Sequence, residues 1–235
     1  MPDRRILAFD TSAAHCAAVL LIGDRIVAQS FRELEKGQAE CLMPMLQAVM
    51  DDGGAVWEEL DAIGVGTGPG NFTGIRISVS AARGLALALG IPAVGVTTFE
   101  VVRRLLNAEQ GLSVTLIPGR GESVMGQVAR DGVVSASWQA SRAEFVCHDY
   151  LDKPAVIRVA DPLPDFGVYQ VQGIGIDCDA PAFEVSDLGT KIAPAIAGIA
   201  ALRLSQAGDV ERPAPLYIRP ADAAPPREAA PLILP

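Results

Sequence analysis

The sequence predicts an α/β protein with mixed sheets flanked by helices, arranged as two halves that are built alike. Three observations predict this class. Short apolar runs of strand length alternate with amphipathic helical patterns, as in layered α/β folds. Half of the 235 residues are hydrophobic, which is enough for a large buried core. A strand, a turn and a strand near the N-terminus recur in the middle of the chain, as in an internal duplication.

The first hundred residues hold the elements with the clearest patterns. Glycine leads the Gly23-Asp24 pair, which is typical of a type II′ hairpin turn between two strands. Helical periodicity covers residues 40–50 and 72–89, and Pro44 must lie in the first turn of the earlier helix or kink it. The expected strands are residues 6–10, 17–22, 25–31, 61–65 and 91–96.

The second half repeats the opening pattern. Residues 115–118 superpose on residues 7–10, and Asp131-Gly132 makes another hairpin turn. Coincidence is the alternative to duplication, because strand–turn–strand units are common. A helix is expected at residues 192–204, as part of the second copy. The expected strands are residues 113–117, 124–128, 133–138 and 168–176.

We therefore expect three parts along the chain. Residues 1–107 form the larger subdomain, residues 108–208 form a smaller one, and residues 209–235 form a tail. Seven of the seventeen prolines fall between Pro213 and Pro235. The tail is therefore expected to lack regular structure, and to be either extended along the body or disordered.

Charge and hydropathy exclude two classes of protein. The chain has 19 basic and 28 acidic side chains and a net charge of −9, whereas a protein that binds phosphates by itself normally carries the opposite excess. Direct, unaided binding of nucleic acid is therefore not expected. The N-terminus enters its first strand with no apolar signal segment, and Arg76 and Arg83 interrupt the apolar stretch at residues 74–96. These features favour a cytoplasmic protein.

No metal centre is expected. Zinc sites need clustered ligands, and the cysteines and histidines of this chain form no Cys-x-x-Cys or similar pair. Buried or half-buried reduced thiols are the expected state of the cysteines. The side chains concerned are Cys16, Cys41, Cys147, Cys178, His15 and His148.

The most specific motif is a glycine-rich run at residues 66–76, between an expected strand and an expected helix. Its glycines permit tight turns, its asparagine or threonine can cap the helix, and free N–H groups at a helix start attract anions. The alternative is a tight connection that binds nothing. A P-loop is excluded, because no Gly-Lys-Ser or Gly-Lys-Thr occurs in the chain. The candidate anion-site residues are Gly68, Gly70, Asn71, Thr73 and Arg76.

Asp10-Thr11-Ser12, at the end of the first strand, forms the other half of this candidate site. The carboxylate can hold hydrated magnesium and the hydroxyls can bond a phosphate, or these groups can satisfy the N–H groups of a turn. Two facing halves are the plan of the actin-like ATPase superfamily, whose subdomains are ribonuclease-H-like and whose second half supplies another acid. Pro118 takes that place here, so the site is interpreted as a vestigial nucleotide site. Arg76 opposes the helix dipole, so an anionic neighbour is expected beside it.

The two helices of the larger subdomain offer a surface for a partner. Small residues on the later helix would let another helix approach closely, and methionines on the earlier helix can repack against a partner. Both helices are apolar over more than one face, as expected when a second surface is buried. The alternative is that these faces pack on the protein's own sheet. The expected interface residues are Leu42, Met43, Met45, Leu46, Met50, Gly74, Ile75, Ser78, Val79 and Ala82.

Six segments share the pattern of a known family. They are residues 6–12, 42–46, 60–63, 68–76, 84–86 and 215–219. They resemble TsaB, also called YeaZ, most specifically in the Gly-Pro-Gly-Asn-Phe-Thr-Gly-Ile-Arg run at residues 68–76. Three positions depart from the family: Gln38 replaces a histidine, Asn71 replaces a serine, and Pro118 begins a Pro-Gly-Arg in place of Asp-Ala-Arg.

The resemblance implies a subunit without chemistry of its own. Family members bind the paralogue TsaD, which transfers a threonylcarbamoyl group to adenosine 37 of tRNAs that read codons beginning with A, and they work with the ATPase TsaE. It implies no metal or cofactor of the chain's own, ATP or ADP and Mg²⁺ only in the complex, a homodimer when TsaD is absent, and tRNA contact only through partners. The label M22 peptidase, often given to such chains, has no nucleophile–base pair to support it here. A free-standing phosphotransferase of the same superfamily is the alternative.

Overall fold

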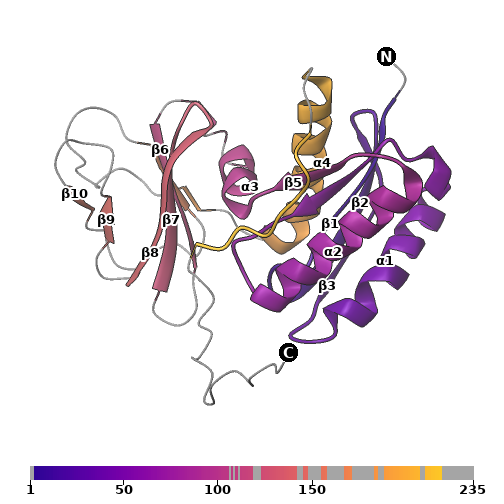
Figure 1. The fold of residues 1–235 in the computed structure, drawn as a ribbon, viewed down its shortest axis with the longest axis horizontal. Helices are drawn as coiled ribbons and strands as arrows, with labels where there is room; N and C mark the ends of the chain where they lie inside the picture. Colours follow the sequence, from indigo (N-terminus) through magenta and orange to yellow (C-terminus); the bar gives the residue numbers. More distant parts are fainter. Residues whose placement is uncertain are drawn as a thin grey trace, which may run out of the picture.

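The computed structural model describes residues 3–105, 107, 109–110, 112–118, 123–141, 145–147, 155–157, 167–170, 183–184, 188–206 and 210–218. Within these residues, two five-stranded sheets stand apart, with helices α3 (Thr98–Leu105) and α4 (Leu188–Ser205) between them (Figure 1). Helices α1 (Gln38–Asp52) and α2 (Phe72–Leu89) cover the outer face of the first sheet. The predicted α/β class is confirmed.

The first sheet combines an antiparallel meander with two parallel strands. Its strand order is β3-β2-β1-β4-β5, in which β4 runs parallel to β1 and β5 runs parallel to β4. Gly23, with φ +62°, makes the predicted two-residue turn between β2 and β3. The strands are β1 (Arg5–Asp10), β2 (His15–Ile22), β3 (Arg25–Glu33), β4 (Ala62–Gly66) and β5 (Ala93–Val96).

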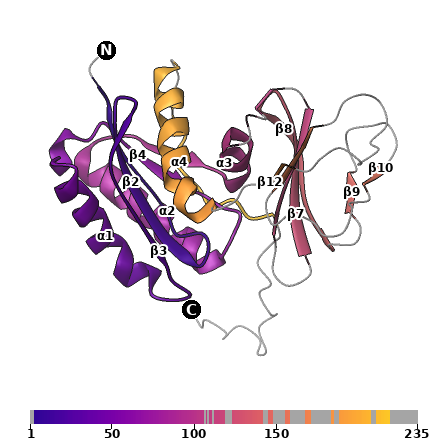
Figure 2. The same ribbon diagram turned by 180° about the vertical axis from the view of Figure 1, so that it is seen from behind.

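Both faces of the first sheet are buried, which explains the unbroken apolar runs of its central strands. On β1, Leu7 and Phe9 belong to the core shared with α1 and α2, whereas Ile6 and Ala8 belong to the core shared with α4. Figure 2 shows these two helix layers on opposite sides of the sheet. A strand with this alternation needs apolar residues at every position.

The two outer helices occupy nearly the predicted residues. α2 ends at Gly90, whose left-handed backbone, with φ +67°, closes the helix and whose N–H bonds to Ala86 O. α1 begins at Gln38, so Pro44 lies in its second turn rather than its first, and the helix continues to Asp52.

The helix that we expected in the second copy covers the first sheet instead. α4 packs against β1, β2, β4 and β5 (Figure 1). Its buried face is rich in alanine, and a Cβ on Gly64 of β4 would lie only 3.1 Å from Ile196 Cγ2. Small groups on both sides therefore let α4 lie close to the sheet, and this contact decides which half of the protein the helix completes.

The second sheet keeps the strand order of the first but not the strand directions. Its order is β12-β11-β6-β7-β8, and Asp131 and Gly132, both with positive φ, turn β7 into β8. Pro118 ends β6 as Asp10 ends β1. However, β11 is antiparallel to β6, whereas β4 is parallel to β1, and residues 171–176 of the expected strand lie outside the described residues. The strands are β6 (Leu112–Pro118), β7 (Ser123–Arg130), β8 (Val133–Ser141), β11 (Gly167–Gln170) and β12 (Phe183–Glu184), beside a separate pair, β9 (Phe145–Cys147) and β10 (Ala155–Ile157).

Helix α3, which the sequence patterns did not predict, connects the two sheets. A reciprocal cap starts it: Thr97 N donates to Glu100 Oε2 at 2.8 Å, and Glu100 N donates to Thr97 Oγ1 at 3.2 Å. Arg103 is 2% exposed and donates from Nη1 to Gln127 Oε1 at 2.7 Å and to Thr115 Oγ1 at 3.3 Å, both in the second sheet. Burial lowers the pKa of the Arg103 guanidinium.

Two helices are long enough and apolar enough, by length and composition alone, to cross a membrane. α2 and α4 are each 18 residues long with a mean hydropathy of 1.2. Both contribute buried residues to the cores of the first sheet, α2 on one face and α4 on the other. This is the place of core helices in a globular protein.

The two cysteines whose side chains the structure describes are free thiols, Cys16 buried and Cys41 half-buried, as predicted. Burial, with smaller contributions from Cys41 and Asp10, raises the pKa of the Cys16 thiol to about 12. The thiols of Cys147 and Cys178 lie outside the described side chains.

We predict that Cys16 stays protonated and unreactive in the folded chain at pH 9, where an ordinary thiol is half ionised. The unfolded thiol loses its proton first, so the free energy of unfolding should fall as the pH rises from about 9 toward about 12. Alkylation with iodoacetamide, followed by mass spectrometry, measures the reactivity. Labelling of Cys16 in the native chain as fast as in urea would contradict this.

Candidate functional site

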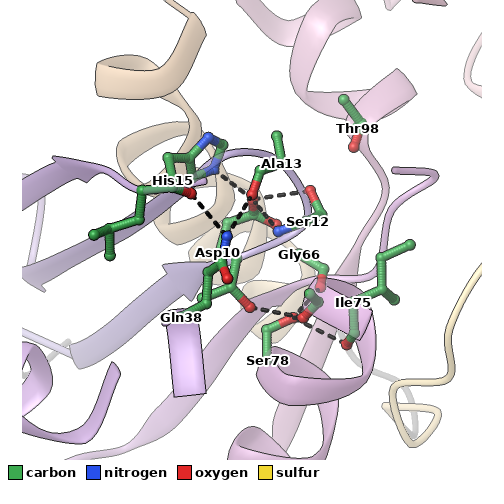
Figure 3. Close-up of polar contacts among 12 residues, drawn as sticks. Asp10, Ser12, Ala13, His15, Gln38, Gly66, Ile75, Ser78 and Thr98 are labelled. Carbon is green, nitrogen blue, oxygen red and sulfur yellow. Dashed lines mark hydrogen bonds and ion pairs between the residues drawn. The ribbon is translucent and has the colours of Figure 1, made fainter. Parts of the chain in front are cut away.

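The candidate site begins where β1 ends. Asp10 is fully buried there, and its Oδ1 accepts hydrogen bonds from Ser12 N and Ser12 Oγ, each at 2.9 Å, and from His15 Nε2 at 2.7 Å (Figure 3). A carboxylate only accepts hydrogen bonds, so Nε2 of His15 carries the proton of this bond. The interpretation of Asp10 and Ser12 as groups that satisfy a turn is supported.

The other carboxylate oxygen, Asp10 Oδ2, is buried and has no hydrogen-bond partner. It lies against Gly66 at the end of β4, where a Cβ would lie only 1.8 Å from it. An unpaired buried acceptor costs about 1–3 kcal/mol, and more when the group is charged. Oδ2 is enclosed, and it occupies the space beside Gly66 that a side chain would fill.

The glycine-rich loop closes over the same turn. Asn71 N donates to Ser12 O at 2.6 Å, and Thr11 Oγ1 donates to Gly74 O at 2.7 Å. A Cβ on Gly70 would lie 2.2 Å from Ser12 O, and a Cβ on Gly74 would lie 1.9 Å from Thr11 O. These glycines are needed because two backbones touch here, and the contact leaves no room for a phosphate group between loop and turn.

The N-terminus of α2 is capped from within the chain. Asn71 Oδ1 accepts hydrogen bonds from Thr73 N at 3.0 Å and Gly74 N at 3.1 Å, as predicted for a capping residue. Gly68 turns the loop with φ +86°, and its carbonyl accepts a bond from Thr98 N at 2.8 Å. The cap therefore occupies N–H groups that an anion would need at this helix start.

Arg76 contacts aromatic side chains rather than an anion. Its Nε donates to the Tyr217 hydroxyl at 3.0 Å, and its guanidinium carbon lies 3.8 Å from the centroid of the Phe72 ring. The two rings themselves are 5.1 Å apart. The expectation of an anionic neighbour is wrong for the described part of the chain, because the phenol oxygen and the face of the Phe72 ring offset the charge.

The extended segment at residues 210–218 carries Tyr217 to this place (Figure 1). Leu216 N donates to Thr67 O at 2.8 Å, and Pro213 packs against Gly95, where a Cβ would lie 3.1 Å from Pro213 Cβ. The start of the tail is thus extended along the body, which is one of the two predicted states. Residues 219–235 lie outside the described residues.

Nine of the ten predicted interface residues are buried inside the chain, and only Met43, at 44%, is exposed. Ser78 shows the reason, because its Oγ donates to Gly66 O at 3.2 Å and so joins α2 to β4. The small face of α2 serves the approach of the helix to its own sheet, which was the alternative to a partner-facing side. The buried nine are Leu42, Met45, Leu46, Met50, Gly74, Ile75, Ser78, Val79 and Ala82.

The outward sides of α1 and α2 offer a different surface, which we call the α1–α2 face. The two helices lie next to each other on the outside of the first sheet (Figure 1). Leu87 is 83% exposed, and a Cβ on Gly84 would meet nothing within 4 Å. The α1–α2 face consists of Met43, Gln47, Ser80, Arg83, Gly84 and Leu87.

Sequence reasoning missed two polar contributions to the site. His15, expected to stand alone, bonds Asp10 because the turn from β1 to β2 brings the two side chains together. The spacing of five residues across an expected turn was the available signal. Gln38, noted only as a departure from a family pattern, is buried and donates from Nε2 to Leu34 O at 2.8 Å, which holds the chain at the start of α1.

A magnesium–phosphate group does not fit this arrangement. Asp10 Oδ1 already accepts three hydrogen bonds, Oδ2 faces β4, and the loop backbone covers the turn. Within the described ranges, no three histidine, cysteine or carboxylate side chains gather as a metal site. The site as folded is closed.

Sequence comparison relates the chain to proteins of tRNA modification. The family model for TsaD, tRNA N6-adenosine threonylcarbamoyltransferase, matches residues 32–156. The tRNA threonylcarbamoyladenosine biosynthesis protein TsaB of Escherichia coli is 37% identical over 157 residues, which are 66% of this chain and 64% of that protein. TsaB of Bacillus subtilis is 35% identical over 97 residues, 41% of this chain and 42% of that protein. The chain therefore matches less than two thirds of the length of these curated relatives.

Solved structures extend the similarity to nearly the whole fold. YeaZ from Pseudomonas aeruginosa superposes with a TM-score of 0.59 and 25% identity, over 91% of this chain and 99% of that chain. A second Pseudomonas aeruginosa structure, described as an uncharacterized protein with similarity to peptidase YEAZ, has a TM-score of 0.64 and 23% identity over 92% of this chain and 100% of its own.

Gly74→Ala and Gly84→Ala form a matched pair on α2. Alanine favours a helix over glycine at both positions, and at residue 84 its Cβ meets nothing, so we expect a stabilisation of about 0.5–1 kcal/mol there. At residue 74 the Cβ would lie 1.9 Å from Thr11 O, so we expect a destabilisation of about 1–3 kcal/mol. Urea denaturation measures both. Equal effects of the two substitutions would contradict the close approach of loop and turn.

Proposed function

Because this chain belongs to the TsaB/YeaZ family of the actin-like ATPase superfamily, we propose that it is an accessory subunit in the synthesis of threonylcarbamoyladenosine in tRNA, without catalytic activity of its own. The Escherichia coli and Bacillus subtilis relatives are named for the biosynthesis of this nucleoside. The closed site at Asp10 is the observation that carries the non-catalytic part of the proposal.

The closure of the site argues against phosphoryl transfer by this chain. Such transfer needs a metal ion and free donors that hold the phosphates in line. Here the donors at the start of α2 bond Asn71, the carboxylate of Asp10 bonds its own turn, and Pro118 stands at the end of β6 where a second acid is expected. ATP or ADP with Mg²⁺ would then bind only in the assembled complex.

TsaD is the proposed partner, together with the ATPase TsaE. The chain itself matches the TsaD family model over a stretch that contains both α1 and α2. Two proteins that share a helix pair can meet around an approximate two-fold axis, each presenting the same face. The α1–α2 face, with the exposed Leu87 and Met43, is the surface proposed for this contact, and a second copy of the chain would use it when TsaD is absent.

The charge of the chain supports an indirect contact with tRNA. A net charge of −9 repels a phosphate backbone, so the tRNA is proposed to lie on the partner subunits. A cytoplasmic location follows from this role.

Reconstitution tests the proposal. TsaD and TsaE from the same organism are incubated with tRNA and the substrates of the reaction, with and without this chain, and threonylcarbamoyladenosine is measured by mass spectrometry. We expect product only when this chain is present, and no turnover of ATP by the chain alone. Steady ATP hydrolysis by the isolated chain that is lost in Asp10→Asn would overturn the proposal in favour of a phosphotransferase.

We predict that Leu87→Glu weakens the capture of TsaD about tenfold or more, because a buried charge replaces an apolar contact in the α1–α2 face. Leu202→Glu is the matched control, since Leu202 is 49% exposed on α4, on the other side of the first sheet. Both variants should keep the melting temperature of the parent chain. Equal capture of TsaD by the two variants, measured by titration calorimetry, would place the interface elsewhere.

A further inference from the structure

The extended segment at residues 210–218, which we call the strap, contacts the glycine-rich loop at both of its ends. Where the loop leaves β4, Thr67 O accepts a hydrogen bond from Leu216 N at 2.8 Å. Where the loop enters α2, the Tyr217 ring lies 5.1 Å from the Phe72 ring, inclined by 32°. Two neighbouring residues of the strap therefore hold the two points between which the loop runs.

Few polar contacts hold the strap itself. Among the described residues, the bond from Leu216 N to Thr67 O is the backbone hydrogen bond that joins the strap to the rest of the chain. Pro213 and Pro215 have no N–H group that could add another. The hydrogen bond at the Tyr217 hydroxyl is exposed, and of the strap residues only Pro213 is buried. A segment of this kind opens at a small cost in free energy, so the strap can leave while the rest of the chain stays folded.

The loop is held by close backbone contacts with the turn after β1 and with α3. Asn71 N donates to Ser12 O in the turn at 2.6 Å, and Gly68 O accepts a bond from Thr98 N of α3 at 2.8 Å. The fully buried Asp10 ends the strand that precedes this turn. While the strap is in place, the fixed ends of the loop restrict its movement away from the turn.

We propose that the strap locks the glycine-rich loop, so that the loop leaves the turn after β1 only when the strap has left the body of the protein. Both contacts are made by adjacent residues, so one displacement of Leu216 and Tyr217 releases both ends of the loop. The strap thereby determines whether the turn and the carboxylate of Asp10 stay covered. The lock is a property of the fold and does not depend on the proposed role in tRNA modification.

The structure also favours the return of the strap. Pro213 and Pro215 restrict the backbone of the released segment, so less conformational entropy is lost when it binds again. Gly95 of β5 leaves room for the strap, since a Cβ there would lie 3.1 Å from Pro213 Cβ. The strap is therefore suited to reversible opening.

Native-state hydrogen exchange, followed by nuclear magnetic resonance, tests the order of opening. The amide of Leu216 reports on the strap and the amide of Asn71 reports on the loop. The amide of Gly90, which bonds Ala86 O at the far end of α2, is the reference. In the parent chain we expect Leu216 to exchange at least as fast as Asn71. The opening free energy of Asn71 should lie below the free energy of global unfolding in urea.

Tyr217→Ala removes the contact between the strap and α2, and it should fold because Tyr217 is 41% exposed. We expect the exchange of Leu216 and of Asn71 to become faster by the same factor, about tenfold, because every opening of the loop includes an opening of the strap. The rate of Gly90 should not change, because a helix end frays locally. Glu211→Ala, at an exposed position of the same strap, is the matched control and should change none of the three rates.

Three results would overturn the proposal. One is exchange of Asn71 at the parent rate in Tyr217→Ala, because the loop would then open with the strap in place. Another is an opening free energy of Asn71 equal to that of global unfolding in the parent chain, because the loop would then not open as a separate unit. The third is an equal acceleration of Gly90 in Tyr217→Ala, which would show a general loosening of α2 instead of the release of its start.

Discussion

The contact of the glycine-rich loop with the turn after β1 is the constraint on which the rest of the structure depends. Two stretches of backbone touch there, and side chains at Gly70 or Gly74 would collide with Ser12 O or Thr11 O. The contact fixes where α2 starts, and so which of its residues meet the sheet. It also covers Asp10, which makes a carboxylate at the end of a strand part of the interior.

This constraint separates two roles on one helix. The small residues of α2, such as Ser78 and Ala82, allow the helix to approach β4, and they are used entirely by the chain's own fold. The opposite side of α2 is exposed among the described residues, with Leu87 83% exposed and open space beside Gly84. The loop and the turn are thus occupied by each other, whereas the outward side of α2 stays exposed.

The later part of the chain forms the second sheet, and it also supplies a helix and an extended segment that pack against the first sheet. α4 covers the inner face of the first sheet, and the segment that ends at Tyr217 crosses to Thr67 and Arg76. Conversely, Arg103 of α3, which follows the first sheet in the sequence, donates hydrogen bonds to side chains of the second sheet. The two halves are thus interlocked by long-range contacts, and a boundary drawn in the sequence does not separate two independent cores.

The sequence by itself determined the features that depend on neighbouring residues. Glycine at residue 23 and the Asp131-Gly132 pair specify tight turns, Asn71 caps the helix that follows it, and apolar periodicity marks α1, α2 and α4, because each of these effects acts within a few residues. The family pattern at residues 68–76 likewise needs no folding to be seen. Only the tertiary structure decided which face of α2 is buried, that α4 belongs to the first sheet, and that Arg76 meets Tyr217 from 141 positions away. Both sides of α2 contain small and apolar residues, so periodicity cannot tell a sheet-facing side from a partner-facing one. That choice is made by the space available beside β4, which exists only once the strands have paired.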